Sequence, residues 1–350
     1  YPGLAIARAL VRQSPDIEPY FIGAKRGIER DILPTTEFAH ALLDLHPLYR
    51  QTPWNNWRTL AGSLSAFRAL NAIARERRPL ATVGTGGYAA GMALAWARAH
   101  GIRTALHEPD SHPGLTTRVF SRSANAIYLG FPEAASRLRP RAGIPMLPLG
   151  CPIEPPPTSR PDRAAARALW DLPGDAFVVL VTGGSQGARA LNDAVAAWCA
   201  RGLPHGVALI WATGRATAAA YLDRESRLVR VRPYLAPIAD AYAAADVAVT
   251  RAGAMTIAEL CAWQIPSVLV PLPTAAQDHQ THNARATAAA GAAVHLPQSE
   301  LSAVSLDAAV REFMRMPTAL ESMRAAAMRR ARPSAAADIA RELLRLLPPR

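Results

Sequence analysis

Residues 177–192 read FVVLVTGGSQGARALN. The first part is a β-branched apolar run, which is typical of a buried parallel strand. Gly183 and Gly184 interrupt this run, and a pattern of helical spacing begins directly after the loop. The free N–H groups of a helix's first turn, together with the positive end of its dipole, favour an anion at such a junction. The stretch therefore predicts a strand, a phosphate-binding loop and a helix, and with them an α/β fold.

The composition is that of a globular protein, since half of the 350 residues are hydrophobic. This length suits about two domains. The net charge is +12 and Lys25 is the only lysine, so the basic excess is arginine. Such an excess follows either from genomic base composition or from attraction to phosphates, an acidic membrane surface or nucleic acid. The chain carries no nucleic-acid-binding motif, and we expect no nucleic-acid partner.

Several site classes find no support in the sequence. Cys151, Cys199 and Cys261 are far apart and have no metal-ligand spacing, and no other cluster predicts a metal site. Sparse, odd-numbered cysteines suggest a reducing compartment. We find no Ser–His–Asp triad and no apolar run near the roughly 20 residues of a membrane-spanning helix.

Short apolar runs alternate with helical patterns along the whole chain, which predicts βα units and parallel sheets. Five prolines between residues 151 and 161 form a stiff connector. We therefore expect an N-terminal domain over residues 1–153, a C-terminal domain over 154–335, and a C-terminal helix over 336–350 that packs back on the N-terminal domain. Two doubly wound, Rossmann-like sheets facing each other would enclose a cleft at the carboxyl ends of their strands. Strands are expected at 20–22, 80–83, 104–106, 126–129, 177–181, 208–211, 228–231, 247–249 and 268–270.

Four further motifs lie at expected strand ends, and each has a structural alternative. Residues 84–88 (GTGGY) are either a second phosphate loop or a tight strand-to-helix turn. Glu259, in the apolar stretch 251–260, is either a solvated helix residue or a carboxylate that accepts hydrogen bonds from a ribose. Residues 278–283 (DHQTHN) are a capped turn or a sugar-binding edge. His107, Glu108 and Asp110 are core or capping residues, or they line the cleft.

In their order and spacing, these five motifs resemble the MurG family, and the resemblance covers nearly the whole chain. Members of that family transfer N-acetylglucosamine (GlcNAc) from UDP-GlcNAc to lipid I, the undecaprenyl-linked muramyl pentapeptide, and so make lipid II for peptidoglycan. The resemblance implies a GT-B fold, metal-independent inverting transfer without a cofactor, and a location peripheral to the cytoplasmic face of the bacterial inner membrane.

The resemblance also implies roles for individual residues. On the donor side, Ser185 with Gly184 and Gln186 would contact the diphosphate, the backbone of Leu235 would hold the uracil, Glu259 the ribose, and Gln280 the GlcNAc hydroxyls. The start of the helix at Ala254, Met255, Thr256, Ile257 and Ala258 would lie against the diphosphate. On the acceptor side, lipid I would face Gly84, Gly86, Gly87, Tyr88, His107, Glu108 and Asp110.

The sequence departs from the family pattern in places. Asp110 stands where the family usually has Asn, and Glu154 stands where an Arg is common. The family's first strand and glycine loop, with the His assigned as catalytic base, would lie upstream of Tyr1, so no residue of this sequence is assigned as the base. Two alternatives stay open: another GT-B transferase, or a non-catalytic UDP-sugar-binding homologue. The Trp54–Trp57 pair and the arginines that end at Arg78 suggest a contact with an anionic membrane surface.

Overall fold

A computed structural model of the protein describes residues 1–45, 56–159, 161–184 and 187–348, with the side chains of residues 56–61, 63 and 88 excepted. The chain forms two compact units. Unit 1 comprises Tyr1–Pro152 and Ser334–Arg350, and unit 2 comprises Ile153–Pro333. Unit 2 is therefore contiguous in sequence, whereas unit 1 is assembled from both ends of the chain.

Unit 2 is built on a parallel six-stranded sheet in the order β12-β11-β10-β7-β8-β9. Counted within the unit, this is the order 6-5-4-1-2-3, which is the strand order of the Rossmann fold. The strands are β7 (Phe177–Thr182), β8 (Val207–Ala212), β9 (Val229–Arg232), β10 (Val247–Thr250), β11 (Ser267–Leu269) and β12 (Ala293–His295). The helices are α6 (Arg163–Ala168), α7 (Arg189–Arg201), α8 (Ile238–Ala244), α9 (Ala254–Trp263), α10 (His279–Ala289), α11 (Ala303–Arg315) and α12 (Pro317–Arg330).

The alternation of β7 shows why helices cover both faces of this sheet. Val179 and Val181 point into a core that includes Trp198 of α7 and Val310 of α11. Val178 and Leu180 point the other way, into a core that also holds residues of α6, α8 and α9. Because both faces of the strand are buried, its sequence is apolar from Phe177 to Val181, as expected for a doubly wound sheet.

A buried ionic cluster fixes the amino edge of the unit 2 sheet. Asp246, directly before β10, accepts hydrogen bonds from the backbone N–H of Val178 at 2.8 Å and from Nη2 of Arg167 at 2.7 Å. Arg167 and Asp246 are both nearly excluded from solvent. The more exposed Arg163 donates to the other carboxylate oxygen at 3.0 Å. This cluster ties α6, β7 and β10 together at the edge opposite the strand carboxyl ends.

Unit 1 contains two parallel sheets, a pair β1-β2 and a four-stranded sheet in the order β3-β4-β5-β6. The strands are β1 (Tyr20–Ala24), β2 (Ala39–Leu43), β3 (Ala81–Gly84), β4 (Arg103–Glu108), β5 (Ala126–Leu129) and β6 (Met146–Leu147). The helices are α1 (Pro2–Gln13), α2 (Glu29–Ile32), α3 (Asn56–Arg77), α4 (Gly87–Ala99), α5 (Leu115–Phe120) and α13 (Ala335–Leu346).

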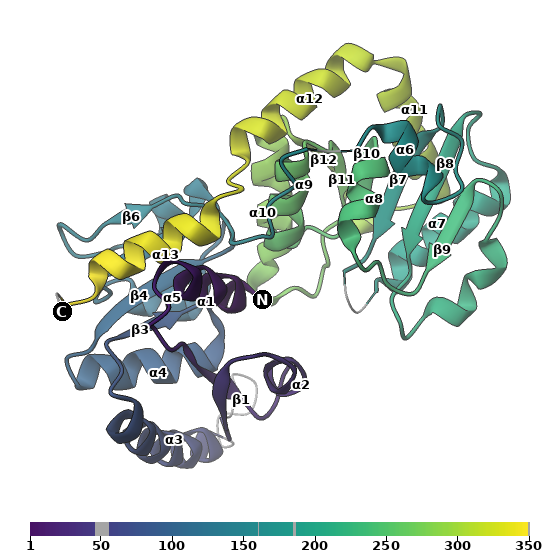
Figure 1. Ribbon diagram of the computed structural model, residues 1–350. Coiled ribbons are helices and arrows are strands. Elements are labelled where there is room, and N and C mark those ends of the chain that lie inside the picture. Colours follow the sequence, from purple (N-terminus) through teal and green to yellow (C-terminus); the bar gives the residue numbers. More distant parts are fainter. Residues whose placement is uncertain (46–55, 160, 185–186, 349–350) are drawn as a thin grey trace. The chain divides into compact units, whose positions relative to one another are not determined.

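The first and last helices of the chain share one face of the unit 1 sheet. Tyr128 of β5 packs against Ile6 of α1 and against Ile339 and Leu343 of α13. Figure 1 shows α1 and α13 side by side, and Nε2 of Gln13 donates to the Ala337 carbonyl at 2.8 Å. The opposite face of β5 packs against Leu94 of α4. The C-terminal helix therefore completes the core of the N-terminal unit.

Every expected strand is present, although most strand ends differ from the expected bounds by one or two residues. Three strands, β2, β6 and β12, have no counterpart among the expected ones. β6 and β12 have only two and three residues, too few for a periodic pattern. Short strands at or near a sheet edge are defined by their pairing partners, and their sequences carry little signal of their own.

Candidate functional site

Glycine packing shapes the loop between β7 and α7. A Cβ on Gly183 would lie 2.5 Å from both the N and the Cβ of Ala188, so the loop closes too tightly for a side chain there. Gly187 has a φ of +77°, and its Cβ would lie 2.5 Å from the Thr213 carbonyl oxygen after β8. Gly184 has a φ of +84° and nothing within 4 Å of a Cβ. Ser185 and Gln186, expected at the diphosphate, lie outside the described residues.

Two buried residues of the predicted motifs, Arg251 and Asn283, hold the loop between β10 and α9 in place, a role that the sequence analysis did not assign to them. The guanidinium of Arg251 donates to the carbonyls of Val270 and Pro271, and to Oε1 of Gln298 at 2.7 Å. Nδ2 of the fully buried Asn283 donates to the Ala252 carbonyl at 3.2 Å. The polar stretch 278–283 therefore contributes at least one residue to loop architecture. The available signal in the sequence was Arg251 itself, a charged residue directly after an apolar strand.

The two helices that follow these loops, α7 and α9, lack side-chain caps at their N-termini. Ala188 precedes α7 and Gly253 precedes α9, and neither residue makes a side-chain cap hydrogen bond. No acidic residue occupies the first turn of either helix. The first-turn N–H groups thus keep their capacity to donate, and both dipoles present positive ends. A diphosphate is the kind of ligand that this arrangement attracts.

Strand order brings these two loops together. β7 and β10 are hydrogen-bonded neighbours, with Thr182 in register with Thr250. The helix after β7 packs on one face of the sheet, and the helix after β10 packs on the opposite face. The loops after these two strands therefore flank the topological switch point. In open α/β sheets, ligands bind beyond the carboxyl ends of the strands at this point. The sequence motifs at 183–188 and 251–260 therefore belong to one candidate site within unit 2.

Glu259, in the second turn of α9, is a partly buried carboxylate with one strong donor. The phenol of Tyr242 in α8 donates to its Oε2 at 2.7 Å. Burial raises the pKa of Glu259 above its ordinary value, and the hydrogen bond from Tyr242 works in the opposite direction. Because Tyr242 uses only one acceptor position of the carboxylate, Glu259 can accept further hydrogen bonds from a ligand.

The other expected donor residues differ in what they can offer. The side chains of Leu235, Ala254 and Ile257 are buried, so these residues can reach a ligand only through backbone atoms. Met255, Thr256 and Ala258 are half-buried. Oε1 of Gln280 accepts a hydrogen bond from the Leu272 N–H at 3.0 Å. The Gln280 amide nitrogen has no partner among the described residues and stays available as a donor.

Backbone strain is concentrated just before α10. Gln277 and Asp278 have φ values of +55° and +54°, in the left-handed region that favours glycine. Oδ1 of Asp278 accepts a hydrogen bond from the Thr281 hydroxyl at 2.6 Å. Strained residues of this kind persist where the surrounding structure enforces them, often at ligand sites. Gln277 and Asp278 lie two to three residues before Gln280 in the sequence.

In unit 1, the acceptor-side motifs lie at one edge of the sheet. Gly84 ends β3 in register with Leu106 of β4. Gly86 and Gly87 have φ values of +99° and +78°, with open space where a Cβ would stand. Thr116 of α5 donates to the Gly87 carbonyl at 3.1 Å. The backbone of Tyr88 lies in the first turn of α4, and its side chain is outside the described part of the chain.

His107 and Glu108 are interior residues. His107 is wholly buried, and burial lowers its pKa to about 4, so it is neutral at physiological pH. Glu108 is 3% exposed, and its two carboxylate oxygens accept hydrogen bonds from the N–H groups of Asp110 and Gly114. The two side chains therefore shape the loop after β4, and contact with a ligand would run through that loop. Asp110 is half-buried.

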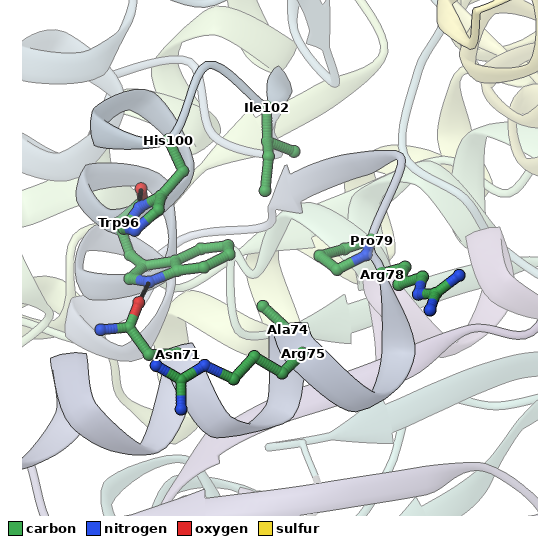
Figure 2. A pocket seen from close by; sticks show the side chains of 8 residues that line it. All are labelled: Asn71, Ala74, Arg75, Arg78, Pro79, Trp96, His100 and Ile102. Carbon is green, nitrogen blue, oxygen red and sulfur yellow. Dashed lines mark hydrogen bonds between the residues drawn. The ribbon is translucent and has the colours of Figure 1, made fainter.

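A surface hollow of about 530 Å³ lies elsewhere in unit 1, at the C-terminal ends of α3 and α4 (Figure 2). Nε1 of Trp96 donates to Oδ1 of Asn71 at 2.8 Å, and the Trp96 ring stacks on His100. Arg75 and Arg78 also line the hollow. Cationic side chains suit the negative ends of two helices. Because β3 and β4 begin beside this hollow, it lies at the amino edge of the unit 1 sheet, opposite the edge at which Gly84 ends β3.

Among the described residues, no helix combines the length and apolarity needed to cross a bilayer. Nor do any three His, Cys, Asp or Glu side chains in the described part of the chain gather where they could hold a metal ion.

Comparison with known proteins identifies the family. The model of the glycosyltransferase family 28 N-terminal domain matches residues 1–129, and that of the C-terminal domain matches residues 178–342. A relative from Moorella thermoacetica, named UDP-N-acetylglucosamine–N-acetylmuramyl-(pentapeptide) pyrophosphoryl-undecaprenol N-acetylglucosamine transferase, is 36% identical, over 99% of this chain and 95% of its own length. A relative of the same name from Desulforudis audaxviator is 38% identical over 96% of this chain and 92% of its own length. The chain belongs to the MurG family. It is therefore a hexosyltransferase.

Solved structures agree with this assignment. The MurG crystal structure from Acinetobacter baumannii has a TM-score of 0.77 and 26% identity, and the match covers 98% of this chain and 95% of that one. The calicheamicin glycosyltransferase CalG4, at 14% identity and a TM-score of 0.69 over 100% of this chain and 96% of that one, shows the fold alone. The α/β class and GT-B fold predicted from sequence, and the resemblance to MurG, are thus confirmed.

Proposed function

We propose that this chain transfers GlcNAc from UDP-GlcNAc to lipid I and thereby makes lipid II for peptidoglycan. The observation that carries the proposal is the pair of uncapped helix N-termini, α7 and α9, on the adjacent strands β7 and β10. The names of the MurG relatives support the same donor and acceptor.

On the donor side, the diphosphate would lie against the loop at Gly183–Gly184 and the first turn of α9. Glu259 would accept hydrogen bonds from the ribose hydroxyls, and the backbone of Leu235 would hold the uracil. The amide nitrogen of Gln280 would donate to a GlcNAc hydroxyl, while its oxygen stays on the Leu272 N–H. Ser185 and Gln186 remain predicted diphosphate contacts.

The reaction is a displacement at the anomeric carbon. The C4 hydroxyl oxygen of the muramyl sugar would bond to C1 of GlcNAc, while the bond from C1 to the diphosphate oxygen breaks with inversion. A general base accepts the hydroxyl proton, a contribution of about 10²–10⁴-fold in rate. UDP leaves with both electrons of the broken bond. The N-termini of α7 and α9 would stabilise the departing diphosphate electrostatically, which needs no metal ion.

On the acceptor side, lipid I would meet the open backbone at Gly84–Gly87 and the loop that Glu108 holds together. We propose that unit 1 also contacts the cytoplasmic face of the membrane, since its acceptor is anchored there. Trp54 and the side chain of Trp57, on which the sequence argument rests, lie outside the described residues. Flotation with anionic vesicles tests the contact: we expect binding that falls as salt rises, and no binding even at low salt would contradict it.

Transfer of radiolabelled GlcNAc to a lipid I analogue is the decisive assay. Lipid II formation from UDP-GlcNAc, and not from other UDP-sugars, is the expected result. Transfer to a different acceptor would favour another GT-B activity. Tight UDP-GlcNAc binding by the full-length protein without any turnover would favour a non-catalytic binding protein.

A further inference from the structure

The hydroxyl of Tyr242 is aimed at the carboxylate of Glu259. Tyr242 belongs to α8 and is 3% exposed, and its ring lies 5.7 Å, between centroids, from that of Trp263. Its only described polar partner is Oε2 of Glu259, 2.7 Å away. An apolar core thus holds the ring rigidly, and the single polar atom of the side chain points at one acceptor.

This hydrogen bond has two physical effects on Glu259. A glutamate side chain loses rotamer entropy when it is fixed, and a rigid donor fixes part of the side chain before a ligand arrives. The phenol also favours the ionised carboxylate against the effect of burial. Burial and the neighbouring carboxylate raise the pKa of Tyr242 well above its ordinary value, so the phenol stays protonated and always donates.

We propose that Tyr242 is a positioning residue for nucleotide recognition, which holds the Glu259 carboxylate turned toward the ribose hydroxyls of the donor. The inference rests on the proposed ribose role of Glu259. Tyr242 itself touches no ligand atom in this account; it acts by presenting the remaining acceptor positions of Glu259.

The chain offers a matched control. The hydroxyl of Tyr221 donates to Oδ1 of Asp193, also at 2.7 Å and within the same unit. Tyr221→Phe therefore removes a phenol–carboxylate hydrogen bond of equal length that does not involve Glu259. Tyr242→Phe keeps the buried ring and removes only the hydroxyl, so both variants are expected to fold.

The experiment is calorimetric titration of both variants with UDP and with 2′,3′-dideoxy-UDP. We expect Tyr242→Phe to weaken UDP by about 3- to 10-fold, the range of one hydrogen bond, and to leave dideoxy-UDP within about twofold. The Tyr221→Phe variant should change neither ligand by more than about twofold. A loss of affinity for UDP but not for dideoxy-UDP would link the Tyr242 hydroxyl to the two ribose hydroxyls. General loosening of the fold would weaken both ligands alike.

Two results would overturn the inference alone: unchanged UDP binding by Tyr242→Phe, or equal losses for UDP and dideoxy-UDP. If the unmodified protein binds UDP and dideoxy-UDP equally well, the ribose role of Glu259 is wrong and the inference is overturned with it. Whether the protein makes lipid II is scored separately by the transfer assay, so failure of the proposed function is recognised independently.

Discussion

Replacing Glu259 should weaken binding of the donor nucleotide while the protein still folds. A hydrogen bond to a charged group contributes about 1.5–3 kcal/mol, and two ribose hydroxyls would share this carboxylate. One acceptor position is already used by Tyr242, and burial makes ionisation costlier, so the sum should fall below twice that value. We expect Glu259→Ala to cost about 2–4 kcal/mol of UDP affinity, which is about 30- to 700-fold.

The alanine variant needs a stability control, because it leaves the buried phenol of Tyr242 without its acceptor. An unsatisfied buried hydroxyl costs about 1–3 kcal/mol of folding free energy. Glu259→Gln supplies that control: the amide oxygen can still accept from Tyr242, while the negative charge is lost. We expect Glu259→Gln to melt near the unmodified protein and still to bind UDP at least about tenfold more weakly.

Calorimetric titration with UDP measures both variants, and the pH adds a further test. Burial raises the Glu259 pKa, and only the ionised form offers all its acceptor positions, so UDP affinity should fall as the pH drops through that raised value. The same decline should be missing in Glu259→Gln. A folded Glu259→Ala variant that binds UDP within about threefold of the unmodified protein would refute the ribose role.

Three more predictions follow from single contacts. Gln280→Ala should weaken UDP-GlcNAc while barely changing UDP; equal losses in titration would mean that its bond to the loop is what matters. Asp246→Ala removes the carboxylate partner of a buried Arg167 guanidinium and should cost about 3–5 kcal/mol in chemical denaturation, against less than about 1 for the exposed pair with Arg8 that is lost in Glu37→Ala. Gly183→Ala must push the loop open and should reduce UDP binding by about tenfold or more with a stability cost of about 1–3 kcal/mol; unchanged binding would contradict the proposed fit.

Unit 2 was largely predictable because its signals are local. An apolar run, two glycines and a helical pattern defined β7 and α7, and the helix expected to start at Ala254 begins at that residue in the structure. The order of the strands was not predictable from such patterns. It depends on pairing between segments far apart in sequence, and it is this order that brings Thr182 and Thr250 into register at the switch point.

Polar residues near the site were harder to interpret from sequence. Glu108 is the last residue of β4 and precedes a loop, a position that is typical of both ligand contacts and loop caps. Two backbone N–H groups satisfy its carboxylate, so the structure shows the capping role. Asn283 lies in a run of polar residues yet is fully buried. A single sequence does not show which face of α10 turns inward, since the helix is polar nearly all round.

The sharing of unit 1 between both chain ends has a consequence for biosynthesis. Unit 2 is contiguous and can finish folding as it leaves the ribosome, but α13 is made only after it. The bond between Gln13 and Ala337 spans 324 residues, and closing so long a loop is slow. Until then, Ile6 and the β5 face that α13 covers stay open to water. During synthesis, the nascent N-terminal unit is thus the part of the chain most prone to aggregation and the part that chaperones would protect most usefully.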